Sequence, residues 1–105
     1  MRQRLCLYFL SYLMPDWYVY ILRCRHGSLY TGVATDVERR IADHLAGKGA
    51  KYLRGRGPLK LVFSKKVGEK GRALKVEHQV KRLPRHKKEA LIEGGFNANS
   101  SFSRD

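Results

Sequence analysis

Acidic residues are scarce in this chain. Nine Asp and Glu stand against 22 Lys and Arg, which gives a formal net charge of +13 over 105 residues. Such an excess of cations attracts polyanions through electrostatic steering and counterion release, so nucleic acid is the expected class of partner. Charge alone does not separate a nucleic-acid binder from a heparin-binding or membrane-surface protein, and it indicates no chemistry.

Cysteine is almost absent as well. The two thiols, Cys6 and Cys24, lack the spacing of a metal site, and we expect neither to have a function. Two thiols in a basic chain without an export signal favour a reducing compartment. The cytoplasm is therefore the expected location.

Long hydrophobic runs are missing too. The apolar residues 5–14 follow a basic start and resemble a signal peptide, but they are too few to span a bilayer, and Met14-Pro15-Asp16 has no small-residue cleavage site. We interpret residues 1–14 as an apolar extension of a single domain over residues 15–95. Two interpretations of residues 1–13 fit the sequence: an addition from a start codon placed too far upstream, or a short helix that packs on the domain.

Residues 17–33 have the pattern of a β-hairpin. Aromatic and β-branched residues are frequent in positions 17–24 and 28–33, with Arg25-His26-Gly27 between them. A three-residue hairpin loop usually ends in a left-handed residue, which suits Gly27 and pairs Cys24 with Ser28. Side chains then alternate so that four project from one face: Tyr18, Tyr20, Leu22 and Tyr30. A two-residue loop at His26-Gly27 would instead place Tyr20 and Tyr30 on opposite faces.

A helix, a loop and a third strand are expected next. Thr35 and Glu38 match a capping box, and an apolar stripe at Val37, Ile41 and Leu45 predicts a helix up to Gly47. Four glycines and four cations in residues 47–57 predict a loop. The apolar residues 59–64 predict the strand.

Two further helices complete the domain. An apolar stripe predicts a helix over residues 72–83, and Pro84 begins a shorter one that Gly94 and Gly95 end. The order strand, strand, helix, strand, helix, helix predicts an α+β domain in which helices flank a small three-stranded antiparallel sheet. The polar residues 96–105 are expected to be a disordered tail.

Glu77 lies at the edge of the apolar stripe of the helix at residues 72–83. One interpretation is an ordinary salt bridge to Lys81, one turn later. The other is a ligand for a hard cation, because one carboxylate, waters and substrate phosphate oxygens suffice to hold Mg²⁺.

Arg40 and His44 lie one helical turn apart beside the stripe of the first helix. Arginine binds phosphate through its planar fork and permanent charge, and histidine can donate a hydrogen bond or move a proton. Spacing alone does not favour Arg40 over Arg39. Hairpin tyrosines usually serve packing, so Tyr20 and Tyr30 matter only together, beside cations that polarise their hydroxyls.

With these residues the chain resembles the GIY-YIG nuclease family over roughly residues 16–95. Tyr18-Val19-Tyr20 stands where the family has Gly-Ile-Tyr, and Tyr30-Thr31-Gly32 stands where it has Tyr-Ile-Gly. Arg40 follows Tyr30 by ten residues, as the motif asks, and His44 and Glu77 match a histidine and the metal-binding glutamate of the family. The first triplet lacks its glycine, the second has Thr for Ile, and Glu89 lies near the position of an asparagine that many members carry.

The resemblance implies a small stand-alone bacterial endonuclease that hydrolyses phosphodiesters with Mg²⁺ or Mn²⁺. Glu77 would hold the metal, Arg40 would neutralise charge on the scissile phosphate, and Tyr20 or Tyr30 would position and deprotonate the water. His44 would be an accessory donor or proton shuttle. The expected substrate is DNA more than RNA, in repair or recombination, with no obligate protein partner. Nucleic-acid contacts are expected from Lys48, Lys51, Arg54, Arg56 and Lys81.

Two other classes of function fit the same sequence. A catalytically degenerate member would keep only the binding of DNA or RNA, and metal-dependent cleavage would separate it from a nuclease. A membrane-surface protein would use residues 1–14 and the cations. Unchanged folding and nucleic-acid binding after deletion of those residues would exclude it.

Overall fold

The computed structural model describes residues 15–95, in which three strands and three α-helices follow the predicted order. Their bounds are β1 Trp17–Arg23, β2 Leu29–Ala34, α2 Val37–Leu45, β3 Lys60–Gly68, α3 Lys70–Lys81 and α4 Arg85–Gly95. Two single-turn 3-10 helices, η1 Arg25–Gly27 and η2 Lys51–Leu53, lie in the connections. The predicted extension at residues 1–14, with Cys6, and the predicted tail at residues 96–105 lie outside the described residues.

The hairpin has the predicted three-residue loop and register. Cys24 donates its N–H to the Ser28 carbonyl at 2.8 Å, and Gly27 has the positive φ of 86° that the loop requires. Tyr20 pairs with Gly32 and Leu22 pairs with Tyr30 across the two strands. The shared face of Tyr20 and Tyr30 is thereby confirmed, since directly paired residues project to the same side.

The third strand is longer than its apolar residues predict. It runs from Lys60 to Gly68 and pairs antiparallel with β1, so that β1 is central and the sheet order is β2-β1-β3. The predicted strand ends at Ser64 because Lys65 and Lys66 follow. Lysines are compatible with an edge strand, where they also discourage pairing with another chain.

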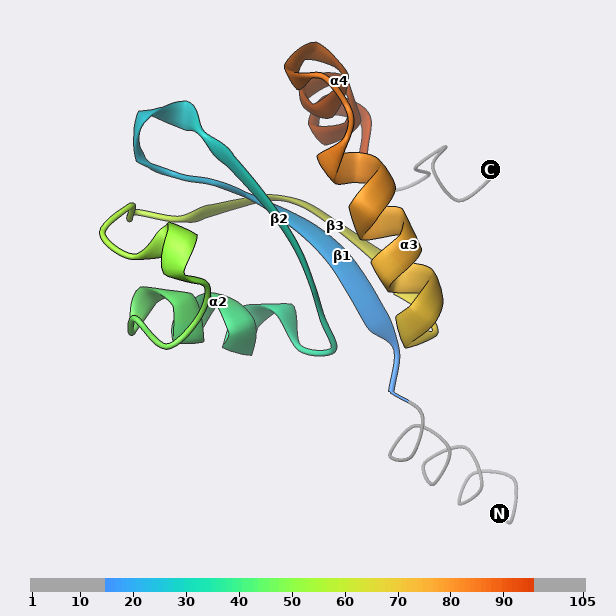
Figure 1. The fold of residues 1–105 in the computed structure, drawn as a ribbon, viewed down its shortest axis with the longest axis horizontal. Coiled ribbons are helices and arrows are strands. Elements are labelled where there is room, and N and C mark those ends of the chain that lie inside the picture. The colour runs from blue at the N-terminus through green and yellow to red at the C-terminus, as the bar shows by residue number, and fades with distance from the viewer. Residues whose placement is uncertain (1–14, 96–105) are drawn as a thin grey trace.

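Each face of the sheet carries its own apolar core. Tyr20, Leu22 and Leu53 are buried on one face, with Val37 and Ile41 of α2 packed against them. The other face buries a second cluster with side chains from α3 and α4: Ile21, Val62, Phe63, Val80, Leu91 and Ile92. Figure 1 shows α2 on one side of the strands and α3 on the other. Among the described residues, no helix is long and apolar enough to cross a membrane.

Two details of α2 differ from the prediction. Asp36, not Thr35, caps the helix, because its Oδ1 accepts a hydrogen bond from the Arg39 N–H at 3.1 Å. Leu45, expected in the apolar stripe, is 60% exposed. The helix ends at Leu45, and Leu53 of the following connection belongs to the core of this face instead.

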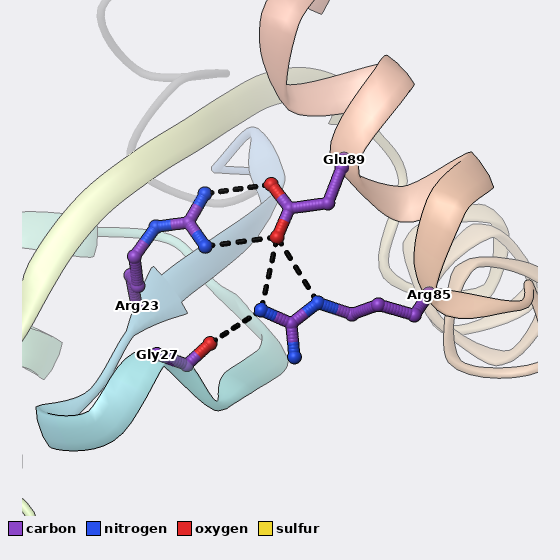
Figure 2. A network of polar contacts seen from close by, with 4 residues as sticks. All are labelled: Arg23, Gly27, Arg85 and Glu89. Carbon is purple, nitrogen blue, oxygen red and sulfur yellow. Dashed lines mark hydrogen bonds and ion pairs between the residues drawn. The ribbon is translucent and has the colours of Figure 1, made fainter.

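A shared carboxylate joins α4 to the hairpin (Figure 2). Glu89 accepts two hydrogen bonds from the Arg23 guanidinium, at 2.9 and 2.7 Å, and one from Arg85 at 3.0 Å. Arg85 also donates to the Gly27 carbonyl at 2.7 Å. The Arg23 hydrogen bond is the main reason why the pKa of Glu89 falls from 4.5 to about 2. The network ties the last helix to the end of β1 and to the loop.

Candidate functional site

The centre of the site is a hydrogen bond between two buried side chains. The Tyr20 hydroxyl lies 3.0 Å from His44 Nε2, and the two residues are 1% and 3% exposed. His44 Nδ1 accepts a hydrogen bond from the Ala50 N–H at 3.1 Å. A backbone N–H can only donate, so Nδ1 carries a lone pair and the proton of the neutral ring is on Nε2. His44 therefore donates to the Tyr20 oxygen.

This arrangement leaves the hydrogen of the Tyr20 hydroxyl available to another acceptor. Burial, and next the neighbouring Tyr30, raise the pKa of Tyr20 to about 12, while the Arg40 guanidinium opposes the rise. Burial, and next the charge of Arg40, lower the pKa of His44. At neutral pH, Tyr20 is thus protonated and His44 is neutral, as the hydrogen bond from Ala50 requires.

Two glycines make room for the pair. A Cβ at Gly32 would lie 2.6 Å from the Tyr20 hydroxyl oxygen, so the tyrosine ring can cross the neighbouring strand only where that strand has no side chain. A Cβ at Gly49 would collide with the His44 ring at Nδ1. Gly32 is part of the second family-like triplet, whereas the sequence patterns assign no role to Gly49. Its signal is the cluster of glycines directly after α2.

Tyr30 lies beside the pair. Its ring centroid is 6.4 Å from that of Tyr20 and 5.6 Å from that of His44, in an edge-on arrangement with the imidazole. Its hydroxyl has no hydrogen-bond partner among residues 15–95. The structure thus brings together Tyr20, Tyr30 and His44, two from the shared hairpin face and one from the predicted helix.

Arg40 and Glu77 contribute the charges of the site. Arg40 of α2 interacts with the Tyr20 hydroxyl, and the Glu77 carboxylate of α3 acts on it electrostatically. Arg40 is half-buried, whereas the alternative, Arg39, is exposed. Arg40 and Arg39 both line an open surface hollow of about 470 Å³ between β2 and α2, together with Asp36 and Asp43. The hollow therefore does not distinguish the two arginines.

Glu77 makes the salt bridge that one interpretation predicted. Lys81 Nζ lies 3.5 Å from its Oε2, and the side chains are 52% and 18% exposed. Within residues 15–95 no three His, Cys, Asp or Glu side chains gather into a metal-binding group. Among the described residues, Glu77 supplies the carboxylate that acts on the Tyr20 hydroxyl. Its hard oxygen donors fit a Mg²⁺ ion that draws its other ligands from water and a phosphate. Glu89, in contrast, is committed to Arg23 and Arg85.

The predicted nucleic-acid contacts lie in two places. The exposed cations Lys48, Lys51, Arg54 and Arg56 follow α2, in residues 47–57, and the exposed Lys81 is on α3 next to Glu77. A cavity of about 250 Å³ is lined by Arg54, Arg25 and His44 and by the leucines Leu45, Leu53 and Leu59. The basic connection therefore adjoins the buried pair on its His44 side.

Comparison with known proteins places the chain among small bacterial domains. The model of the GIY-YIG catalytic domain matches residues 16–90. The "UPF0213 protein YhbQ" of Escherichia coli K12 is 50% identical over 82 residues, which are 78% of this chain and 82% of the relative. A "UPF0213 protein" of Cronobacter sakazakii is 49% identical over 81 residues, 77% of this chain and 85% of the relative.

Two structures solved by NMR have the same fold. The UPF0213 protein BH0048 of Bacillus halodurans is 52% identical, covers 77% of this chain and 87% of its own, and has a TM-score of 0.51. The protein EF2693 of E. faecalis is 36% identical, with coverage of 74% and 83% and a TM-score of 0.54. The names of all these relatives specify no substrate.

Proposed function

The chain belongs to the GIY-YIG catalytic domain family, and from this membership and the geometry of the site we propose that it is a metal-dependent nuclease that hydrolyses phosphodiester bonds of DNA. The observation that carries the proposal is the buried Tyr20–His44 hydrogen bond with Tyr30, Arg40 and Glu77 around it. A carboxylate can hold the metal ion, a guanidinium can bind the phosphate and a fixed tyrosine hydroxyl can orient the water in single-metal hydrolysis of a phosphodiester. The net charge of +13 favours binding of a polyanionic substrate such as DNA.

The charged residues have separate roles. Arg40 binds the scissile phosphate and stabilises the negative charge that develops on it. Glu77 would hold Mg²⁺ or Mn²⁺, for which Lys81 must release the carboxylate; their bridge is long and its lysine half exposed, so little free energy opposes this exchange. The ion, when bound, would supply Lewis-acid stabilisation of the leaving oxygen.

The two tyrosines have different roles because of His44. Tyr20 accepts a hydrogen bond from His44 and, with its pKa raised to about 12, keeps its own proton. It therefore donates to the phosphate or to the attacking water and orients it. Tyr30, whose hydroxyl is free of protein partners in the described chain, is the residue that takes the proton from water, and its own hydroxyl proton passes to bulk solvent. His44 is a positioning residue, since both of its ring nitrogens are engaged.

A second candidate function is a nucleic-acid-binding module without catalysis. The ion pair between Glu77 and Lys81 favours it, because a carboxylate that stays paired with a lysine does not bind a metal ion. The basic residues would serve this function equally well, and the substrate could then be RNA or DNA.

Cleavage assays on defined substrates test both. Labelled single-stranded, double-stranded and branched DNA, with RNA alongside, is incubated with the purified protein and Mg²⁺, Mn²⁺ or EDTA. Glu77→Ala should abolish cleavage and leave folding and most of the binding intact. Glu93→Ala, which removes an exposed carboxylate of α4, is the control. Tight, salt-dependent binding with no cleavage of any substrate would support the binding module instead.

A further inference from the structure

The rings of the site continue into the basic connection that follows α2. The Tyr52 ring stacks on Tyr30, with centroids 6.1 Å apart and an angle of 21° between the planes. The guanidinium carbon of Arg56 lies 4.3 Å from the centroid of Tyr52. Tyr52 is 45% exposed, and Arg56 is exposed. A column of three side chains thus leads from Tyr30 to the surface.

The backbone around this column is fixed. Leu53, next to Tyr52, is 2% exposed and donates its N–H to the Ala50 carbonyl at 3.0 Å. Gly55 has a φ of +71°, which lets the chain turn back toward Tyr52. Arg56 then donates its N–H to the Leu53 carbonyl at 3.2 Å, and its own carbonyl accepts from the Arg25 N–H at 2.9 Å. The backbone at Tyr52 and Arg56 is therefore held in place by these hydrogen bonds.

Within residues 15–95, no acceptor binds the hydrogen-bond donors of the Arg56 guanidinium. It has no acidic partner within residues 15–95, and residues 47–57 contain no Asp or Glu. An arginine that rests on an aromatic face keeps its N–H edges open to an anion and loses less side-chain entropy on binding. Exposed aromatic side chains among cations are also the usual means of holding a nucleic-acid strand.

We propose that Tyr52 and Arg56 bind the strand beside the scissile phosphate, with Arg56 on a flanking phosphate, and that Tyr52 couples this contact to Tyr30. The role of Tyr30 in this inference rests on the proposed function, whereas the contact itself does not. Tyr52 is a positioning residue, because its ring contacts both the Tyr30 ring and the Arg56 guanidinium. Binding of the flanking phosphate then orders the ring next to the reacting water.

The contact is tested by binding without catalysis. Anisotropy of labelled single-stranded and double-stranded DNA is measured in EDTA for Arg56→Lys, which keeps the charge but loses the planar stack. The expected loss of affinity is about fivefold. Arg72→Lys makes the same change on an exposed residue of α3 and should stay within about twofold of wild type, because its charge remains. Equal affinities of the two variants would overturn the contact.

The coupling is tested at Tyr52. Tyr52→Leu removes the stacked ring, so it should lower kcat about tenfold and shift the NMR resonances of Tyr30. Tyr52→Phe keeps the stacked ring and should leave those resonances in place. Melting temperatures should stay close to wild type because the residue is half exposed. Wild-type kcat and unshifted Tyr30 resonances in Tyr52→Leu would overturn the coupling.

The two measurements separate this inference from the proposed function. If the wild type cuts no substrate while Arg56→Lys still binds about fivefold more weakly, the nuclease proposal fails and the contact stands. If the wild type cuts and Arg56→Lys equals Arg72→Lys in both assays, the contact fails and the nuclease proposal stands.

Discussion

The Tyr20 hydroxyl oxygen lies 3.0 Å from His44 Nε2, and the other nitrogen of the same imidazole accepts the N–H of Ala50. One neutral ring thereby connects the central strand, the helix α2 and the connection that follows it. The direction of each hydrogen bond follows from the backbone donor. The orientation of the Tyr20 hydroxyl is therefore set by His44, which is itself held by the backbone of the connection after α2.

Replacing His44 by phenylalanine should remove two hydrogen bonds, the buried one to Tyr20 and the part-buried one from Ala50. The Ala50 N–H and the Tyr20 hydroxyl lose their hydrogen bonds in a site that stays filled, and the expected destabilisation is about 2–4 kcal/mol. Urea unfolding measures it, with the exposed His86→Phe as control. A loss below that of the control would contradict the buried hydrogen-bonded role.

The two close glycines should be intolerant of alanine. Gly32→Ala places a methyl group against the Tyr20 hydroxyl, and Gly49→Ala places one against the His44 ring, so each should cost about 1–3 kcal/mol through forced displacement. In Gly94→Ala the added Cβ meets open space on α4, and stability should rise by about 0.5–1 kcal/mol. Thermal unfolding should show lower melting temperatures for Gly32→Ala and Gly49→Ala and a higher one for Gly94→Ala.

The arginine of the site should act on the rate more than on affinity. Arg40→Ala removes the guanidinium that we propose stabilises developing charge, and kcat should fall by about 10²–10³ with a small change in KM. Arg39→Ala, on the exposed neighbour, should have a smaller effect on kcat. Steady-state kinetics on the preferred substrate measure kcat and KM of both variants. A larger loss of kcat in Arg39→Ala than in Arg40→Ala would reverse the assignment of the two arginines.

The network at Glu89 should make stability depend on pH in acid. The pKa of Glu89 is about 2 in the folded chain against 4.5 for the free group, chiefly because of the Arg23 hydrogen bond. As the pH falls below about 4.5, the unfolded chain takes up this proton first. The stabilisation is therefore complete above that pH and is lost as the pH falls toward 2. Urea unfolding over this interval should show a flatter profile for Glu89→Gln than for wild type or Glu93→Gln.

The parts of the site that could be predicted from sequence depend on local periodicity. The loop length of the hairpin decides which residues share a face, because side chains alternate strictly along a strand, and this placed Tyr20 beside Tyr30. Helical spacing places Arg40 and His44 one turn apart, but the choice of Arg40 over Arg39 came from the resemblance to the family motif. Strand order does not follow from any local pattern, and the extension of β3 through Lys65 and Lys66 was missed because charged residues weaken the strand signal.

The parts that could not be predicted depend on how the connection after α2 packs. Leu53 is a core residue, and Gly49 leaves the space that the His44 ring occupies. Both belong to a segment whose glycines and cations indicate only a loop. Leu45 was wrongly expected in the core, since its spacing is helical but the helix ends there. The stacking of the Tyr52 ring on Tyr30, with almost half of Tyr52 still exposed, likewise depends on the packing of this connection.

The Tyr20 ring crosses the neighbouring strand at Gly32, so the evolution of the two tyrosine triplets is coupled. Any side chain at position 32 would require the ring at position 20 to leave, and phenylalanine in place of Tyr20 would not suffice, since the ring carbon Cζ would be only 2.7 Å from the new Cβ. The two positions are therefore expected to change together in descendants of this fold. A related chain with a larger residue at the position of Gly32 has given up this tyrosine arrangement, whatever charge it retains.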